Sequence, residues 1–140
     1  MEICIATKKE AEDLYILNSL FNNDMEIELI KKSLNENKDE IVCIAYENNI
    51  AIGFCNGYIV RSMCYRDNRA DIESLFVIEE YRGQGVGKTL ITKLENAFYE
   101  RGIRHFHISV NVNNVNALSL YRKIGYVESG EILLEKSLDT

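Results

Sequence analysis

The sequence predicts an α/β fold, with a central mixed sheet of about seven strands and helices on both faces. Short apolar runs of strand length alternate with longer runs whose apolar residues recur at helical spacing. In the first half, Asn48-Asn49 joins two strand-like runs, which is typical of an antiparallel hairpin. Strand, helix, strand crossovers in the second half imply a parallel pair. The expected order is β-α-α-β-β-β-α-β-α-β-β, within one domain spanning residues 1–140.

The first half should begin with a strand over residues 2–6. Thr7-Lys8-Lys9-Glu10 forms a capping box that opens a helix with its apolar residues facing inward. A second helix is expected after Asn22-Asn23-Asp24, and the polar stretch 35–40 is expected to be a loop. The following strands, 41–46 and 50–60, pair across the Asn48-Asn49 turn, because asparagine tolerates the positive φ of tight hairpins.

The second half should contain strands that alternate with helices. After a polar stretch, residues 70–78 form a strand that is apolar on both faces, as a central strand requires. A long helix follows, with Gly102 at its C-terminal end. A strand over 104–110, a helix over 114–124 and a closing hairpin complete the fold. That hairpin pairs residues 126–128 with 132–138 across Ser129-Gly130.

Charge and composition exclude several classes of function. The formal net charge of -6 argues against broad contact with nucleic acid or an anionic membrane. The four cysteines are widely spaced, without a C-x-x-C pair or a histidine-rich neighbourhood, so reduced thiols and no metal site are expected; they are Cys4, Cys43, Cys55 and Cys64. No segment resembles a signal peptide or a bilayer-spanning run, and a cytoplasmic location is expected.

The segment from Arg82 to Gly87 carries the strongest functional signal, because it joins an apolar strand to the long helix. Its three alternate glycines remove side chains that would keep a phosphate away from backbone N–H groups. The helix that follows presents its unpaired N–H groups and the positive end of its dipole to the same place. The segment therefore predicts a site for a ligand that carries a pyrophosphate.

Two nucleotide motifs fit this segment incompletely. As a Walker motif the window ends correctly in Gly87-Lys88-Thr89, but Arg82 stands where the first glycine is needed. The 51 residues after it leave little room for a Mg²⁺-binding strand and a full nucleotide-binding sheet. A dinucleotide fingerprint would need a third glycine where Lys88 stands.

A third interpretation fits both the loop and its surroundings. Arg82-x-x-Gly85-x-Gly87 follows the strand Leu75-Phe76-Val77, and Asn114-x-Asn116-Ala117-x-x-Leu120-Tyr121-x-x-x-Gly125-Tyr126 comes downstream. This combination resembles the GNAT superfamily of acyl-CoA-dependent N-acetyltransferases, most specifically from Glu73 to Tyr126. The chain has Ile78-Glu79 where the family often has Asp-Pro, which leaves the turn less fixed and the glycines unaffected.

The resemblance implies acetyl-CoA as co-substrate and no metal. The pyrophosphate would rest on the backbone of the loop and the start of the helix, and the pantetheine arm would add like a strand to the preceding strand. The residues implied are Leu75, Phe76, Val77, Arg82, Gly83, Gln84, Gly85, Val86, Gly87, Lys88 and Thr89. Asn114 would face the pantetheine amides, although it also suits a helix cap, and Asn116 suits the helix start. Arg82 is either a phosphate partner or a solvated cation, and an ordinary tight turn is the structural alternative for the loop.

Two residues are the catalytic candidates. Tyr121 occupies the motif position where the family protonates the departing thiolate, and it lies two helical turns from Asn114; a core tyrosine is the alternative. Glu73 is the candidate base, because a carboxylate within an apolar strand is costly unless paired or used, and burial would raise its pKa. A salt bridge to a nearby arginine is the alternative. Asp71 shares its face and is a candidate for holding a cationic substrate, whereas His105 and His107 are weaker candidates for the base.

The acceptor side carries no motif. Acidic residues in the regions that shape the family's acceptor site favour a cationic amine, such as a polyamine, an aminoglycoside-like sugar or a peptide amine; they are Glu26, Glu28, Asp67 and Asp71. Some aromatic residues are candidates for lining that site, namely Tyr15, Phe21, Tyr58 and Tyr65. The expected reaction is direct acetyl transfer to a primary amine in a ternary complex, without a cysteine intermediate. The alternative is a non-catalytic acyl-CoA sensor, and a homodimer is expected from family habit and exposed strand edges.

Overall fold

A computed structural model describes residues 1–21 and 23–139, so Asn22, expected to precede the second helix, lies outside the described residues. The chain divides into two compact units, Met1–Ile108 and Ser109–Thr140. Within the described residues, no helix has both the length and the apolar character needed to cross a membrane.

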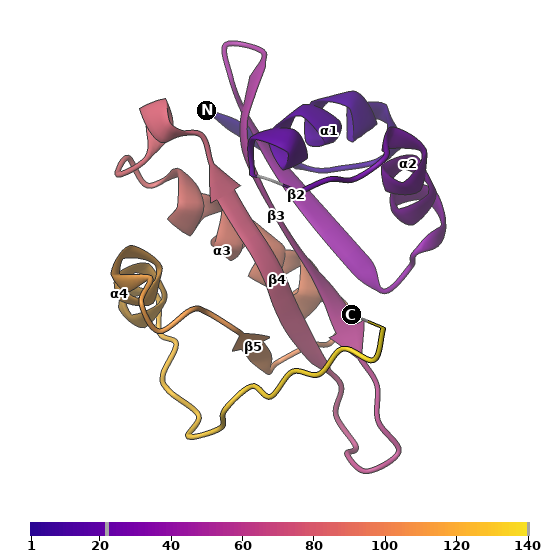
Figure 1. Ribbon diagram of the computed structural model, residues 1–140, viewed down its shortest axis with the longest axis vertical. Helices are drawn as coiled ribbons and strands as arrows, with labels where there is room; N and C mark the ends of the chain where they lie inside the picture. Colours follow the sequence, from indigo (N-terminus) through magenta and orange to yellow (C-terminus); the bar gives the residue numbers. More distant parts are fainter. Residues whose placement is uncertain (22, 140) are drawn as a thin grey trace. The chain divides into compact units, whose positions relative to one another are not determined.

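The first unit is built on a five-stranded sheet with the spatial order β1-β2-β3-β4-β5 (Figure 1). Its strands are β1 Glu2–Ile5, β2 Glu40–Glu47, β3 Ile50–Val60, β4 Arg69–Val77 and β5 Phe106–Ile108. The first four strands pair antiparallel in succession, and β4 pairs parallel with β5. The expected mixed sheet is confirmed, although β5 is shorter than the strand expected over 104–110.

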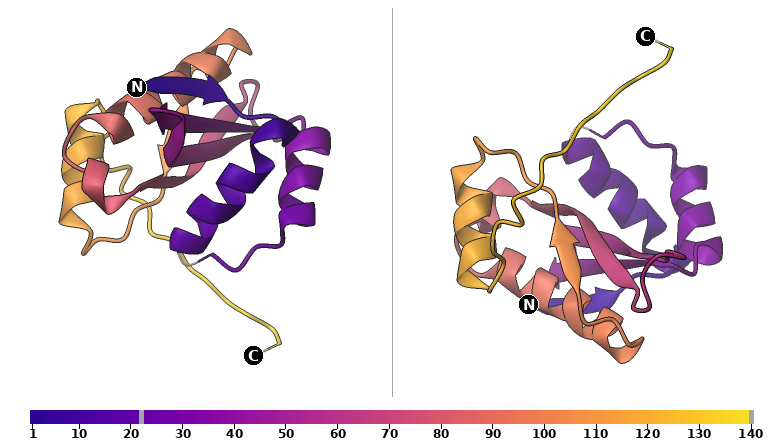
Figure 2. Two further views of the ribbon diagram at one scale, coloured as in Figure 1. Left: turned by 90° about the horizontal axis from the view of Figure 1, so that it is seen from above. Right: turned by 90° about the horizontal axis from the view of Figure 1, so that it is seen from below.

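Three α-helices cover the two faces of this sheet. Helices α1 (Ala11–Leu20) and α2 (Ile27–Glu36) lie on one face, and α3 (Val86–Glu100) lies on the other (Figure 2). The expected capping box is present: the Thr7 N–H donates to Glu10 Oε1 at 2.8 Å, and the Lys9 N–H donates to Thr7 Oγ1 at 3.3 Å. It opens a 3₁₀ turn, Lys8–Glu10, which leads into α1.

The hairpin between β2 and β3 forms as its turn residues predict. Asn48 and Asn49 take positive φ angles of 50° and 65°, which asparagine adopts more readily than most residues.

The face under α3 is a closely packed apolar layer. Leu90, Leu94 and Phe98 of α3 are fully buried against the sheet. A Cβ added to Gly57 of β3 would meet the Asp71 carbonyl oxygen at 2.8 Å and Phe98 at 3.2 Å. Glycine is therefore required there because the helix and the neighbouring strand approach too closely for a side chain.

The second unit contains α4 (Val115–Lys123), which is capped by Asn114: its Oδ1 accepts a hydrogen bond from the Ala117 N–H at 3.1 Å. The expected closing hairpin is wrong, because no strand is present among residues 126–139, so the described sheet has five strands instead of about seven. Ile132, Leu133 and Leu134 favour a strand by composition, yet each is at least 72% exposed. Strand propensity alone does not form a ladder without a neighbouring strand and an apolar surface to pack against.

Candidate active site

The glycine loop leaves β4 through a 3₁₀ turn, Glu79–Tyr81, and enters α3 at Val86. Gly83 and Gly85 take φ angles of 75° and 85°, in the left-handed region that other residues rarely adopt. An added Cβ would meet nothing within 4 Å at either position. The two glycines are therefore required by backbone conformation, and they leave the space above the loop open.

The start of α3 presents unpaired N–H groups toward that space. The first intrahelical bond runs from the Thr89 N–H to the Gly85 carbonyl at 3.1 Å, so the N–H groups of Val86, Gly87 and Lys88 precede the helical ladder. Gly85 is the N-cap and has no side chain to accept from them. This end of the helix has the backbone donors and the dipole orientation that bind an anion.

Arg82 connects the loop to the end of β4. Its Nε donates to the Val77 carbonyl oxygen at 2.8 Å, and its guanidinium lies 5.7 Å from the centre of the Phe76 ring. Neither sequence-based interpretation of Arg82 described this contact. The arginine holds the loop against the strand, which fixes the loop's position relative to Leu75–Val77.

The outer edge of β4 is open where the loop begins. The parallel ladder with β5 covers only Ala70–Ile72, and Leu75–Val77 pair with β3 on one side. Among the described residues, no strand pairs with the opposite edge of Leu75–Val77. An open edge of this kind can accept an extended ligand through backbone hydrogen bonds.

A β-bulge in β4 changes the face of the strand on which Glu73 lies. Asn56 of β3 lies opposite Ser74, and Gly57 lies opposite Ile72, so Glu73 is the extra residue of β4. A bulge breaks the alternation of a strand, and here it brings Glu73 to the face that Ser74 also occupies. Both residues line the same cavity.

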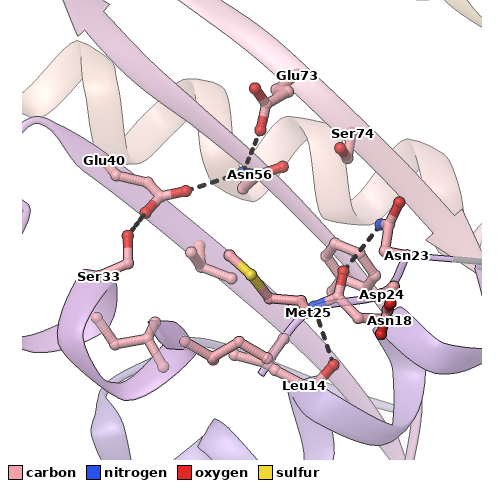
Figure 3. Close-up of a pocket in the computed structure, with 14 residues that line it drawn as sticks. Leu14, Asn18, Asn23, Asp24, Met25, Ser33, Glu40, Asn56, Glu73 and Ser74 are labelled. Carbon is pink, nitrogen blue, oxygen red and sulfur yellow. Dashed lines mark hydrogen bonds between the residues drawn. The ribbon is translucent and has the colours of Figure 1, made fainter. Parts of the chain in front are cut away.

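This cavity of about 500 Å³ lies between the sheet and the α1–α2 pair (Figure 3). Three of its 14 lining residues are carboxylates, Asp24, Glu40 and Glu73, and none is a lysine, arginine or histidine. Asn56 connects two of them: its Nδ2 donates to Glu40 Oε2 at 2.9 Å and to Glu73 Oε1 at 3.1 Å. Glu40 also accepts a hydrogen bond from the Ser33 hydroxyl on α2.

The Glu40 and Glu73 carboxylates have no counter-ion in the part of the chain that the structure describes. Asn56 Oδ1 is buried and without a hydrogen-bond partner there, which is a cost of turning the amide NH₂ group toward both carboxylates. The cavity therefore has a negative wall that is organised by hydrogen bonds and not neutralised by protein cations.

Glu73 differs from its sequence-based description in two respects. The expected burial is wrong, because the Glu73 side chain is exposed. The alternative of an arginine salt bridge is also absent among the described residues. Asp71 takes that role instead, because Arg69 Nε lies 2.8 Å from Asp71 Oδ1. The two acidic residues of β4 thus have different partners.

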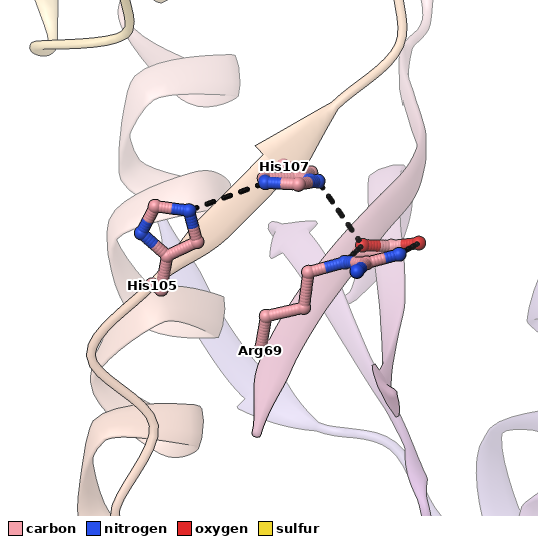
Figure 4. A network of polar contacts seen from close by, with 4 residues as sticks. Arg69, His105 and His107 are labelled. Atoms are coloured by element: carbon pink, nitrogen blue, oxygen red, sulfur yellow. Dashed lines mark hydrogen bonds and ion pairs between the residues drawn. The ribbon is translucent and has the colours of Figure 1, made fainter. Parts of the chain in front are cut away.

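The two histidines lie beside this ion pair (Figure 4). His107 Nδ1 is 4.0 Å from Asp71 Oδ1, and the Nε2 atoms of His105 and His107 are 3.2 Å apart. Neither histidine lines the cavity. His107 thus contacts Asp71, and His105 contacts His107.

Several residues of the cavity were missed from the sequence. Glu40 and Asn56 lie on different strands from Glu73, and only the register of three neighbouring strands brings them together. The acidic candidates Glu26, Glu28, Asp67 and Asp71 do not line the cavity. The aromatic candidates Tyr15, Phe21, Tyr58 and Tyr65 do not line it either; its aromatic residue is Phe54. The available signal was one polar residue in each otherwise largely apolar strand, Glu40 at the start of β2 and Asn56 within β3.

The remaining candidates belong to the second unit. Asn114 caps α4, which confirms its capping role, and Tyr121 lies within α4 with its ring 6.0 Å from that of Tyr126. The thiols in the first unit are free. Cys43 and Cys55 are buried and Cys64 is exposed, and burial raises the pKa of Cys55 well above its ordinary value.

Known proteins were compared with this chain by sequence and by structure. The model of the acetyltransferase (GNAT) family matches residues 9–126. An acetyltransferase of Yersinia pestis is 29% identical over 99% of this chain and 96% of its own length. An acetyltransferase of Pectobacterium atrosepticum is 30% identical over 83% of this chain and 77% of its own.

Solved structures show the same fold. An aminoglycoside acetyltransferase from an uncultured soil metagenomic sample, in complex with trehalose, superposes with a TM-score of 0.87 at 21% identity, over 99% of this chain and 96% of that one. The aminoglycoside acetyltransferase AAC(6')-Iy, in complex with a bisubstrate analogue, gives 0.86 at 19% identity, over 98% and 97%. At such identities the likeness supports the fold alone. On the family match, the chain belongs to the acetyltransferase (GNAT) family and is an acetyl-CoA-dependent N-acetyltransferase.

Proposed function

We propose that the protein transfers the acetyl group of acetyl-CoA to a primary amine by direct attack in a ternary complex. The observation that carries this proposal is the sequence of features along one segment. A bulged carboxylate, an open strand edge, a glycine loop and an uncapped helix start follow one another from Glu73 to Thr89. They have the order needed to hold a base, a thioester arm and a pyrophosphate.

Coenzyme A would lie along this segment. The pyrophosphate would accept hydrogen bonds from the backbone of Arg82 to Gly87, with Lys88 and Thr89 at the first turn of α3. The pantetheine arm would add to the open edge of Leu75, Phe76 and Val77. A backbone N–H of this edge would stabilise the oxyanion, a contribution commonly worth about 3 kcal/mol.

Glu73 would be the general base. An alkyl ammonium with a pKa near 10.4 must lose a proton before attack, which costs about 4.6 kcal/mol at pH 7. Glu73 would accept this proton. The neutral nitrogen would then form a bond to the acetyl carbon, the carbon–sulfur bond would break, Tyr121 would protonate the departing thiolate, and the extra proton of the nitrogen would restore Tyr121 through solvent. The base lowers the larger barrier, because a thiol with a pKa near 8.5 is a comparatively good leaving group.

Tyr121 would give a proton to the departing thiolate, and Asn114 would face the pantetheine amides. This proposal rests on their positions in the motif of α4. A cysteine intermediate is not part of the mechanism, since Cys43 and Cys55 are enclosed in the sheet and Cys64 lies outside the cavity. We further propose that residues 1–140 act as one catalytic domain and associate as a homodimer, which sedimentation would test.

An acceptor screen tests the reaction. Wild-type protein and Tyr121→Phe are incubated with acetyl-CoA and a panel of primary amines, and released CoA is measured with a thiol reagent. The expected result is amine-dependent thiol release that falls about 10²-fold or more in Tyr121→Phe. Binding of CoA without thiol release for any amine would contradict the proposal and identify the protein as a sensor. Acetylation of Cys64 during turnover would contradict direct attack.

A further inference from the structure

The cavity on the α1–α2 side has more negative charge than the reaction needs. General-base catalysis uses one carboxylate, and three line the cavity without a basic side chain among the lining residues. Glu40 also borders a second cavity, lined in part by Lys38 and Arg101, but it forms no ion pair with either of them. An uncompensated pair of carboxylates is unfavourable in the empty site and becomes favourable when a cation binds.

Glu40 and Glu73 cannot both serve the attacking nitrogen. That nitrogen must be neutral when it attacks, and a second carboxylate beside it would favour the ammonium form instead. Glu40 is held by Ser33 and Asn56, each through a different carboxylate oxygen, and it therefore keeps a fixed orientation. A fixed carboxylate a short distance from the base is suited to hold a cation that stays charged throughout the reaction.

Six of the other eleven lining residues form an apolar part of the cavity wall: Leu14, Met25, Ile30, Leu34, Val42 and Phe54. The other five are polar, and four of them, Asn18, Asn23, Ser33 and Asn56, already donate hydrogen bonds to protein groups. Methylene groups bury favourably against such a wall, whereas sugar hydroxyls placed there would lose hydrogen bonds to water. The wall thus favours an aliphatic spacer between two cationic groups.

We propose that the acceptor is a small aliphatic diamine or polyamine. One amine is acetylated beside Glu73, and a second ammonium, which does not react, binds at Glu40, with Asp24 adding negative charge to the same cavity. Glu40 is a specificity-determining residue in this arrangement, and Asn56 holds the two carboxylates in place. The inference rests on the proposed function and names the class of its acceptor.

The experiment compares acceptors that differ in one charge. The values of kcat/KM are measured with saturating acetyl-CoA for 1,4-diaminobutane and for 1-aminobutane. The aminoglycoside sisomicin and a peptide with a free N-terminus represent the other acceptor classes. Glu40→Gln removes the charge and keeps an oxygen and the side-chain shape. Glu36→Gln is the matched control, because Glu36 is exposed at the end of α2 and outside the cavity.

The kcat/KM for the diamine should be at least about tenfold above that for the monoamine. The monoamine lacks the second ammonium, and losing one hydrogen bond between charged groups is expected to cost about this factor. In Glu40→Gln this preference should fall to within about threefold of unity through a rise in KM for the diamine. Glu36→Gln should keep the wild-type preference. Equal rates for the two amines, an unchanged preference in Glu40→Gln, or faster transfer to sisomicin or the peptide would each overturn the inference.

A binding measurement separates this inference from the proposed function. Titration calorimetry with 1,4-diaminobutane is performed on wild-type protein and Glu40→Gln in the presence of CoA. Binding that is at least about tenfold weaker in Glu40→Gln supports the diamine site even if no amine is acetylated, in which case only the proposed reaction fails. No binding to the wild type, or equal binding to both proteins, overturns the diamine site.

Discussion

The neighbouring residues Cys55 and Asn56 of β3 face opposite sides of the sheet and meet different surroundings. Cys55 is fully buried under α3, and its Sγ lies 3.4 Å from the Leu90 carbonyl oxygen. Asn56 lies on the α1–α2 side, where it holds Glu40 and Glu73 at the cavity. The α3 face contains close-packed apolar side chains. The other face combines an apolar core with the carboxylates that line the cavity.

Substitutions on the two faces of the sheet should therefore have different effects, on folding stability at the α3 face and on catalysis at the α1–α2 face. Close packing under α3 leaves no room for a ligand, so substitutions there act on the folding equilibrium. The α1–α2 side leaves carboxylates without counter-ions among the described residues, which costs stability and is where we propose that the acceptor binds. The bulge in β4 contributes to this difference between the two faces, because it places Glu73 on the cavity side while Ile72 stays buried.

Glu73→Gln should produce the largest effect and act on the chemistry alone. Removing a general base is expected to lower kcat about 10²- to 10⁴-fold, with an unfolding free energy within about 0.5 kcal/mol of wild type. Thiol-release kinetics and urea unfolding measure the two quantities. Asp71→Asn is the matched control on the same strand, since Asp71 is paired with Arg69; a comparable loss in that variant would contradict the assignment of Glu73.

Leu94→Ala should produce the opposite pattern. Leu94 is fully buried under α3, and truncation leaves a cavity that costs about 2–5 kcal/mol in unfolding free energy. The kcat per folded molecule should stay close to that of wild type. Chemical denaturation, with activity measured below the transition, checks both values. A large fall in kcat without loss of stability would show that the two faces are not separate.

Gly85→Ala should affect both stability and binding. A residue with a Cβ at φ 85° costs about 1–2 kcal/mol, and a shift of the N-cap should raise the KM for acetyl-CoA about tenfold. Gly130→Ala is the control, because Gly130 has the same φ of 85° outside the loop. It should lose stability only. An equal rise in KM in both variants would argue against CoA binding at the loop.

Tyr46→Phe should produce the smallest effect, on a polar contact of the α1 side that has no part in the chemistry. The Tyr46 hydroxyl donates to Asp13 at 2.6 Å, and loss of this bond should cost about 1 kcal/mol. Burial, followed by that hydrogen bond, raises the pKa of Tyr46 above its ordinary value of 10.0. The folded state therefore binds this proton more tightly, so the stabilisation is complete below about pH 10 and is lost as pH rises through the folded-state pKa.

The pH dependence of unfolding checks that sign. Wild-type stability should decline more steeply above pH 10 than that of Tyr46→Phe, so the advantage of the wild type in unfolding free energy should shrink as pH rises. Parallel curves over this range would mean that Tyr46 does not couple to folding.

Local signals predicted most of the fold and the loop. The capping box at Thr7, the Asn48-Asn49 turn and the glycines at 83 and 85 each depend on a few neighbouring residues, and their geometry is confirmed. The cavity was less accessible from sequence. Glu40, Asn56 and Glu73 meet through the register of three strands and through one bulge, and neither feature has a local signature. The closing hairpin failed because its residues favour strands without determining what they pair with.

A crystal structure with a bisubstrate ligand, CoA joined through an acetyl bridge to 1,4-diaminobutane, would locate the pyrophosphate, the reacting nitrogen and the distal ammonium together. We expect the pyrophosphate on the backbone of residues 82–87, the acetylated nitrogen within about 3 Å of the Glu73 carboxylate or bridged to it by one water, and the distal ammonium at Glu40. A nitrogen bound away from Glu73, or a diamine chain that leaves the cavity between α1, α2 and the sheet empty, would contradict this expectation.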